Sequence, residues 1–132
     1  MSLDPLDTVR VGIVGPSWWV DYWHLAALKT HPNVEVVGVS GGTERDPESV
    51  KAKYGDKAQY FTDYEVMMDS VRPDGVIVCT PNDLHHPVTM AALARDIHVT
   101  CEKPIALNAK QAFEMATIAE ANNLIGMSNF PY

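Results

Sequence analysis

Short apolar runs alternate with segments of helical spacing along this chain, and no other feature constrains its fold as strongly. Each run has the length of a buried strand, and most are followed by a helical pattern or a capping signal. The predicted strands are residues 9–14, 34–39, 58–61, 75–79, 97–101 and 124–127. Because parallel strands need helical crossovers, the alternation predicts an α/β fold: a doubly wound parallel sheet with helices on both faces.

Capping residues predict where the helices begin and end. Asp46 followed by Pro47 opens a helix that runs to residue 54, where Gly55 stops it. Three further helix starts rest on a capping box or on a proline in the first turn: residues 62–65, Pro87 (helix to residue 94) and residues 108–111 (helix to about residue 120).

The segment of residues 17–30 carries apolar side chains at α-helical spacing, and Pro32 ends it. The stripe expected along this helix is Trp19, Tyr22, Trp23, Ala26 and Ala27. We interpret its aromatic side chains, with Trp18, as core between helix and sheet or as a face for another domain, rather than as a base-stacking platform.

Charge and length exclude several classes of function. The net charge of −7 argues against a nucleic-acid or membrane-surface partner, since both need clustered Lys and Arg. No apolar run approaches the ~20 residues of a membrane-spanning helix, and residues 1–5 lack a secretory signal. Residues 1–8 are expected to be a disordered or leader segment, and residues 9–132 one domain. Two cysteines, Cys79 and Cys101, are too few for a disulfide framework and favour the cytoplasm.

The turn after the first strand resembles a phosphate-binding glycine motif in which two of three glycines are replaced. Gly15 fills the first place, Ser17 the second and Val20 the third. Ser17 can still cap the following helix and offer a hydroxyl and an N–H group to phosphate, with Pro16 and Trp18 beside it. The alternative is a strand-to-helix turn that binds nothing.

The end of the second strand lacks the acidic residue that an NAD site places there to accept from the ribose hydroxyl. Ser40 and Gly41 leave room for a 2′-phosphate, and Thr43 and Arg45 lie close enough in sequence to bind it. The alternative is a solvated turn in which Arg45 pairs with a neighbouring carboxylate, Glu44, Asp46 or Glu48.

Polar side chains follow the strand of residues 75–79 at the edge where open α/β sheets bind ligands. Thr80 and Asn82 offer hydrogen-bonding groups and Pro81 fixes the backbone, although Asn82 can equally cap the next helix. The adjacent His85 and His86 should diverge, and the remaining histidines give no ligand spacing with them, so no metal site is predicted.

Glu102 and Lys103 follow the next strand and should point into the same crevice. Beside a coenzyme, a lysine can donate to a substrate oxygen or carry its proton. The alternative is an exposed Lys–Glu pair that contributes little. No serine or cysteine has the setting of a nucleophile.

Together these segments resemble the N-terminal domain of the glucose-fructose oxidoreductase / inositol dehydrogenase (Gfo/Idh/MocA) family. The most specific part of the resemblance is residues 74–82, then His85, then residues 102–104, in that order and spacing. Residues 24–28 also resemble the family, and the likeness covers residues 9–132.

The resemblance implies a Rossmann domain that binds NAD(P), in which Lys103 approaches the nicotinamide and the substrate hydroxyl. It implies that residues 80–82 lie along the coenzyme, and that Ser40 and Gly41 are typical of members that use NADP. The expected coenzyme-binding residues are Gly15, Pro16, Ser17, Trp18, Ser40, Gly41, Thr43, Arg45, Cys79, Thr80, Pro81, Asn82, His85, Glu102 and Lys103.

Family members continue into a second α/β domain, which supplies the substrate pocket and an Asp-x-x-x-His pair; this domain is absent here. The first hypothesis is therefore the coenzyme-binding half of an NADP-dependent sugar or polyol dehydrogenase, with little or no turnover by this chain alone. The second is a non-catalytic module that senses a dinucleotide, motivated by Ser17 and Val20. Under either hypothesis we expect self-association through apolar surface near the crevice and along the last strand.

Overall fold

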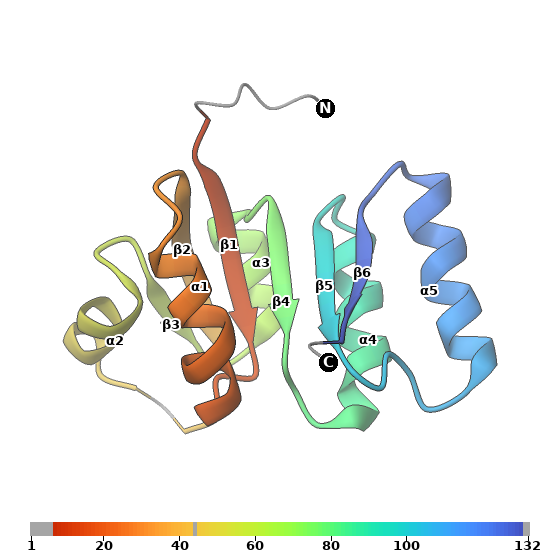
Figure 1. Ribbon diagram of the computed structural model, residues 1–132, viewed down its shortest axis with the longest axis horizontal. Helices are drawn as coiled ribbons and strands as arrows, with labels where there is room; N and C mark the ends of the chain where they lie inside the picture. The colour runs from red at the N-terminus through yellow and green to blue at the C-terminus, as the bar shows by residue number, and fades with distance from the viewer. Residues whose placement is uncertain (1–6, 44, 131–132) are drawn as a thin grey trace.

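A computed structural model describes residues 7–43 and 45–130 and contains one six-stranded parallel sheet. The strand order is β3-β2-β1-β4-β5-β6 (Figure 1). Successive strands are added toward one edge of the sheet up to β3 and toward the other edge from β4 on, so the order of addition reverses between β1 and β4. The strands are β1 (Val9–Val14), β2 (Val34–Ser40), β3 (Gln59–Phe61), β4 (Gly75–Val78), β5 (His98–Glu102) and β6 (Gly126–Asn129). All carboxyl ends therefore lie at one edge of the sheet, and the predicted doubly wound fold is confirmed.

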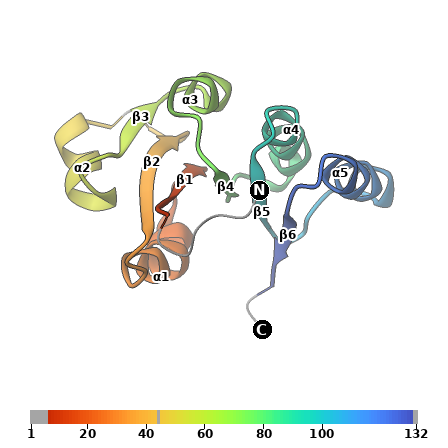
Figure 2. The same ribbon diagram turned by 90° about the horizontal axis from the view of Figure 1, so that it is seen from above.

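Helices lie on both faces of the sheet (Figure 2). One face carries η1, a π-helix, with α1 and α2, and the other carries α3, α4 and α5. Their bounds are η1 (Val20–Leu25), α1 (Ala26–Lys29), α2 (Pro47–Tyr54), α3 (Tyr64–Val71), α4 (Asn82–Leu93) and α5 (Ala109–Ala121). Among the described residues no helix is both long and apolar enough to cross a bilayer.

Two apolar clusters hold these layers together. Met67 and Leu93, both fully buried, belong to the cluster under α3 and α4. Ile13 and Val39 belong to the second cluster and pack against η1 and α2. Each cluster removes one face of the parallel sheet from water, which is what a sheet of this kind requires.

The helix after β1 differs from its prediction. Val20 and Leu25, five residues apart, are its buried side chains, because the π-helical turn brings residues at that spacing onto one face. Tyr22 and Trp23 of the predicted stripe are 67% and 46% exposed. A stripe drawn at α-helical spacing was therefore wrong, and the aromatic cluster is not core between helix and sheet.

The capping predictions are mostly confirmed. Asp46 caps α2 by accepting from the Ser49 N–H at 2.9 Å, and Asn108 caps α5 by accepting from the Gln111 N–H. For α3 the cap is Asp63, not Thr62, since its carboxylate accepts from two backbone N–H groups. The proline predicted for a first turn lies in the interior of α4, because this helix already begins at residue 82.

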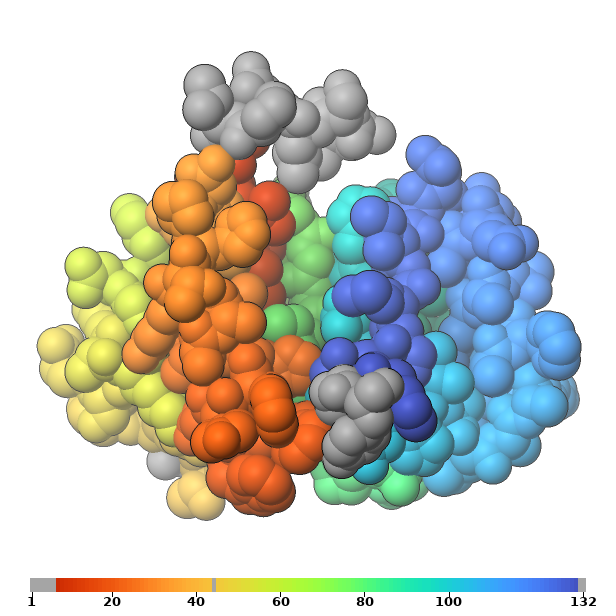
Figure 3. All heavy atoms as spheres, viewed as in Figure 1, coloured from red at the N-terminus to blue at the C-terminus, as the bar shows by residue number. Residues whose placement is uncertain are grey.

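A groove crosses the face of the sheet that carries η1 and α1. It runs between α1 and β6 (Figure 3), encloses about 610 Å³ and has a floor of β1, β4 and β5 side chains such as Ile77 and Thr100. Ile125, Met127 and Phe130 are exposed along β6 and its flanks. The predicted leader, residues 1–8, lies outside the described residues apart from its last two.

Candidate functional site

The turn at Gly15 brings three strand ends together. Its φ of +88° is a left-handed conformation, and a Cβ atom there would lie 2.6 Å from backbone atoms of Cys79 and Thr80. Its N–H donates to the Ser40 carbonyl at 2.9 Å. Only glycine allows the backbone this close to the β4 loop, so Gly15 joins the loops after β1, β2 and β4.

The loop after β2 lies against the same turn. A Cβ at Gly41 would be 3.5 Å from the Gly15 nitrogen, and one at Gly42 would be 3.8 Å from the Pro16 ring. Both glycines have positive φ. Ser40 is buried, whereas Gly42 and Thr43 are the exposed residues of this loop.

Ser17 directly precedes the helical segment after β1, which starts at residue 18 and continues into η1. Its hydroxyl accepts from the Val20 N–H at 3.5 Å, a long hydrogen bond, and its carbonyl accepts from the Asp21 N–H. Val20 is fully buried, so a core side chain occupies the position at which the motif has its third glycine. Trp18 is 72% exposed beside this turn.

A cavity of about 220 Å³ opens at the carboxyl ends of β4 and β5. Its lining residues come from the two loops that the sequence singled out and from the start of the helix after β1: Trp19, Cys79, Thr80, Asn82, His85, Glu102 and Lys103. Lys103 is exposed at its mouth. The structure thus brings Thr80, Asn82 and Lys103 to one cavity, whereas Pro81 lies outside its lining at the start of α4.

Glu102 is the centre of a hydrogen-bond junction that the sequence did not reveal. Its Oε1 accepts from Trp19 Nε1 at 2.8 Å and from Asn129 Nδ2 at 2.6 Å, and it lies 2.7 Å from His24 Nε2. Burial raises the pKa of Glu102, but the hydrogen bonds from Asn129, Trp19 and His24 together lower it further, and the net pKa is below its usual value. The carboxylate is therefore held ionised just before Lys103.

Cys79 lies beside this junction. One ligating atom each from His24, Cys79 and Glu102 lies within 4.8 Å of the other two, a spacing that a metal ion could bridge. The N–H donors of Trp19 and Asn129, however, point at the carboxylate oxygen that a cation would need. Burial, followed by the charge of Glu102, raises the pKa of the Cys79 thiol to about 12, so it stays protonated.

The two adjacent histidines diverge, as predicted. His85 is buried and lies between the β4 and β5 loops, where its ring nitrogens approach the carbonyls of Thr80 and Pro104. His86 lies 2.8 Å from Glu114 of α5 instead. Only His85 belongs to the cavity.

The alternative of a simple ion pair at Arg45 finds no support among the described residues. Asp46 caps α2, and Glu48 lies 3.7 Å from Lys51; Glu44 lies outside the described part of the chain. The Arg45 Nε is buried without a hydrogen-bond partner. Such an orphaned donor next to a glycine loop fits an anionic group that the protein itself does not supply.

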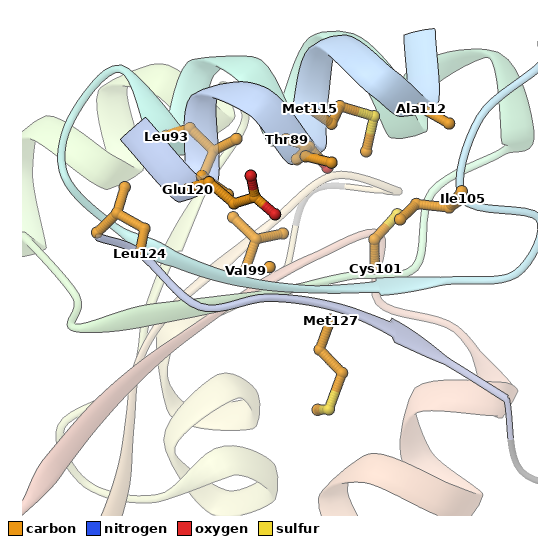
Figure 4. A pocket seen from close by; sticks show the side chains of 13 residues that line it. Thr89, Leu93, Val99, Cys101, Ile105, Ala112, Met115, Glu120, Leu124 and Met127 are labelled. Atoms are coloured by element: carbon orange, nitrogen blue, oxygen red, sulfur yellow. The ribbon is translucent and has the colours of Figure 1, made fainter. Parts of the chain in front are cut away.

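A second cavity, of about 170 Å³, lies between α5 and the β5–β6 edge, away from these loops (Figure 4). Its lining is mostly apolar and includes Leu93, Val99 and Met115. Met127 of β6 also borders this cavity, although its side chain extends on the side of the sheet away from α5 (Figure 4). This cavity lacks the convergent polar groups of the strand-end site.

The strand order, the Gly15 cradle and the crevice where the order reverses define a dinucleotide-binding Rossmann domain. The residues fit such a coenzyme: the Gly15 turn brings the loops after β1, β2 and β4 together, and the buried Thr80 hydroxyl and Arg45 Nε have no hydrogen-bond partner among the described residues. The chain belongs to the oxidoreductase family with an NAD-binding Rossmann fold, whose model matches residues 9–130. The family resemblance read from the sequence is confirmed.

Several known relatives are named as sugar or polyol dehydrogenases. The chain is 36% identical over 119 residues to D-glucoside 3-dehydrogenase of Escherichia coli (strain K12), a match covering 90% of this chain and 33% of that protein. It is 32% identical over 119 residues to scyllo-inositol 2-dehydrogenase (NADP(+)) of Bacillus subtilis (strain 168), covering 90% and 36%. An NAD binding oxidoreductase from Klebsiella pneumoniae has a TM-score of 0.75 and 28% identity, covering 92% and 34%. The chain spans about a third of the length of the curated relatives it matches.

Proposed function

We propose that this chain is the coenzyme-binding part of an NADP-dependent oxidoreductase that transfers hydride between nicotinamide and a hydroxyl compound of the sugar or polyol class. The observation that carries the proposal is the shared cavity of Asn82 and Lys103, next to the Gly15 turn that joins the other two loops. Proton donor and coenzyme site must lie together for hydride transfer to be coupled to proton transfer.

Each residue has a role that follows from its position. Gly15, Gly41 and Gly42 allow the loops after β1, β2 and β4 to meet beside the proposed pyrophosphate position, and Ser17 presents the start of a helix to it. Lys103 holds or donates the proton of the substrate hydroxyl at its Nζ. The bound coenzyme supplies hydride transfer at its nicotinamide C4.

Arg45 selects between the two coenzymes. Arg45 follows the Gly41–Gly42 turn in the sequence and its Nε has no hydrogen-bond partner among the described residues, and no carboxylate ends β2, where one would accept from the ribose hydroxyl of NAD. A guanidinium pairs well with a 2′-phosphate, which NADP carries and NAD lacks. We therefore infer a preference for NADP.

The substrate class rests on the relatives, which are named for glucosides and inositol. The remaining substrate contacts would come from polypeptide of the kind that fills the other two-thirds of those proteins, so we expect this chain alone to bind coenzyme with little or no turnover. The two free thiols fit a reducing cytoplasm. We also expect the chain to self-associate through the exposed groove.

Calorimetric titration with NADPH, NADP, NADH and NAD tests the proposal. We expect NADPH to bind at least about tenfold more tightly than NADH, since a charge-assisted hydrogen bond contributes about 1.5–3 kcal/mol. Arg45→Ala should remove this preference. Lys51→Ala, which removes an exposed positive charge from α2, should leave it intact.

Three other outcomes would count against the proposal in different ways. Binding of no dinucleotide would overturn it. Equal binding of NADPH and NADH would overturn the role of Arg45 alone. If a protein with the full length of the relatives binds the coenzyme but has no activity against sugars and polyols, the sensor hypothesis is favoured instead.

A further inference from the structure

His85 makes two contacts that one neutral imidazole cannot satisfy. The side chain is 1% exposed, its Nδ1 lies 2.7 Å from the Pro104 carbonyl oxygen, and its Nε2 lies 2.9 Å from the Thr80 carbonyl oxygen. Both partners are acceptors only, and both distances are those of hydrogen bonds. A neutral ring has one N–H donor, so its other nitrogen would present a lone pair to a carbonyl.

We infer that His85 is a positioning residue that acts as an imidazolium, donating to Thr80 and Pro104 at once. In this form it joins the loop after β4 to the loop after β5, and it lines the same cavity as Asn82 and Lys103. Loss of one proton breaks one of the two bonds and leaves a carbonyl facing a lone pair in a buried place, which is unfavourable. The separation of the two loops thus depends on the protonation of one side chain.

The charges around the ring are mixed. Glu102 lines the same cavity and supplies a negative charge, while Lys103 opposes it at the mouth. The Cys79 thiol, also in the lining, is neutral. On α4 itself the neighbouring titratable groups are Asp83 and His86, and His86 is turned to Glu114 of α5. A buried imidazolium is stable only with such hydrogen bonds and a nearby carboxylate.

Nuclear magnetic resonance of the histidine ring nitrogens tests the protonation directly. With the native chain labelled with ¹⁵N, we expect His85 to show two protonated nitrogens at neutral pH and to lose one as the pH rises. His86, which has one partner, serves as an internal comparison. A His85 ring with a single protonated nitrogen at every pH in the folded range would overturn the inference, whatever the chain binds.

The consequence for coenzyme rests on the proposed function. Because the two loops line the coenzyme site, we expect NADPH affinity to fall by about fivefold to tenfold from pH ~6.5 to pH ~8.5, a typical size for coupling between sites. In His85→Gln, which is neutral at both pH values, the affinity should be weak throughout and change less. In His86→Gln the native dependence should persist. Titration of the 2′-phosphate itself affects all three proteins equally.

The outcomes separate the two proposals. Two protonated nitrogens together with this pH dependence support the inference. Two protonated nitrogens with no difference in pH dependence between the native chain and His85→Gln overturn the coupling to coenzyme. Absence of NADPH binding at every pH overturns the proposed function, while the ring-nitrogen measurement still decides the state of His85. If His85→Gln does not fold, the measurement on the native chain remains decisive.

Discussion

Replacing Gly15 by alanine tests whether the strand ends are joined as described. The new Cβ would lie 2.6 Å from the carbonyl carbon and oxygen of Cys79 and from the nitrogen of Thr80, all of them backbone atoms that cannot rotate away. The residue would also keep a φ of +88°, which an L side chain rarely adopts. Gly15→Ala must therefore either move the β4 loop or distort the end of β1.

The expected loss has two parts. A non-glycine residue in a left-handed conformation costs about 1–2 kcal/mol, and overpacking against a fixed neighbour costs about 1–3 kcal/mol more. Gly42 offers a matched control, since its φ is +74° but its Cβ would meet only the Pro16 side chain at 3.8 Å and the Pro16 oxygen at 3.9 Å. Gly42→Ala should show the first part alone.

Urea denaturation of both variants and the native chain measures these free energies of unfolding. We expect Gly15→Ala to be destabilised by about 2–5 kcal/mol and Gly42→Ala by about 1–2 kcal/mol. Coenzyme binding should weaken strongly in Gly15→Ala, because the loops after β1 and β4 no longer meet. A Gly15→Ala variant as stable as Gly42→Ala would refute the close approach of Gly15 to the Cys79–Thr80 backbone.

Two further predictions concern the Glu102 junction and the open groove. Since the folded-state pKa of Glu102 is below its usual value of 4.5, its ionised form stabilises the fold above that pH, and this stabilisation disappears as pH falls through the lowered pKa. Glu102→Gln should therefore be less stable than the native chain near neutral pH, with the difference shrinking on acidification; a constant difference in pH-dependent urea denaturation would contradict the junction. Met127→Glu should weaken self-association measured by light scattering, because Met127 is 52% exposed on the last strand and its side chain extends away from α5; a native chain that stays monomeric at high concentration would refute that expectation.

The sequence predicted the sheet because its signals are local. Each strand is a short apolar run, and side chains such as Asp46 and Asn108 cap helices through backbone groups three residues away. Even so, Asp63 took the cap expected of Thr62, since both can accept hydrogen bonds and only the backbone conformation decides between them. Local rules thus fix the kind of element more firmly than its first residue.

The candidate site was predicted in part, for the same reason. Asn82 and Lys103 follow strands, so the carboxyl edge of a parallel sheet was bound to bring them near each other. Trp19, His24 and Asn129 were missed as partners of Glu102 because they are 27 to 83 residues away in sequence. The π-helical turn at Val20 was missed because its five-residue spacing shows no α-helical pattern.

The most direct test of a single coenzyme cleft is a titration of the ¹⁵N-labelled chain with NADPH, followed by backbone amide shifts. We predict that the largest changes fall together on Gly15, Ser17, Gly41 and Lys103, in the loops after β1, β2 and β5, and on Asn82, the first residue of α4 after the β4 loop. Changes confined to the α5 cavity, or spread without reaching the Lys103 loop, would contradict the account.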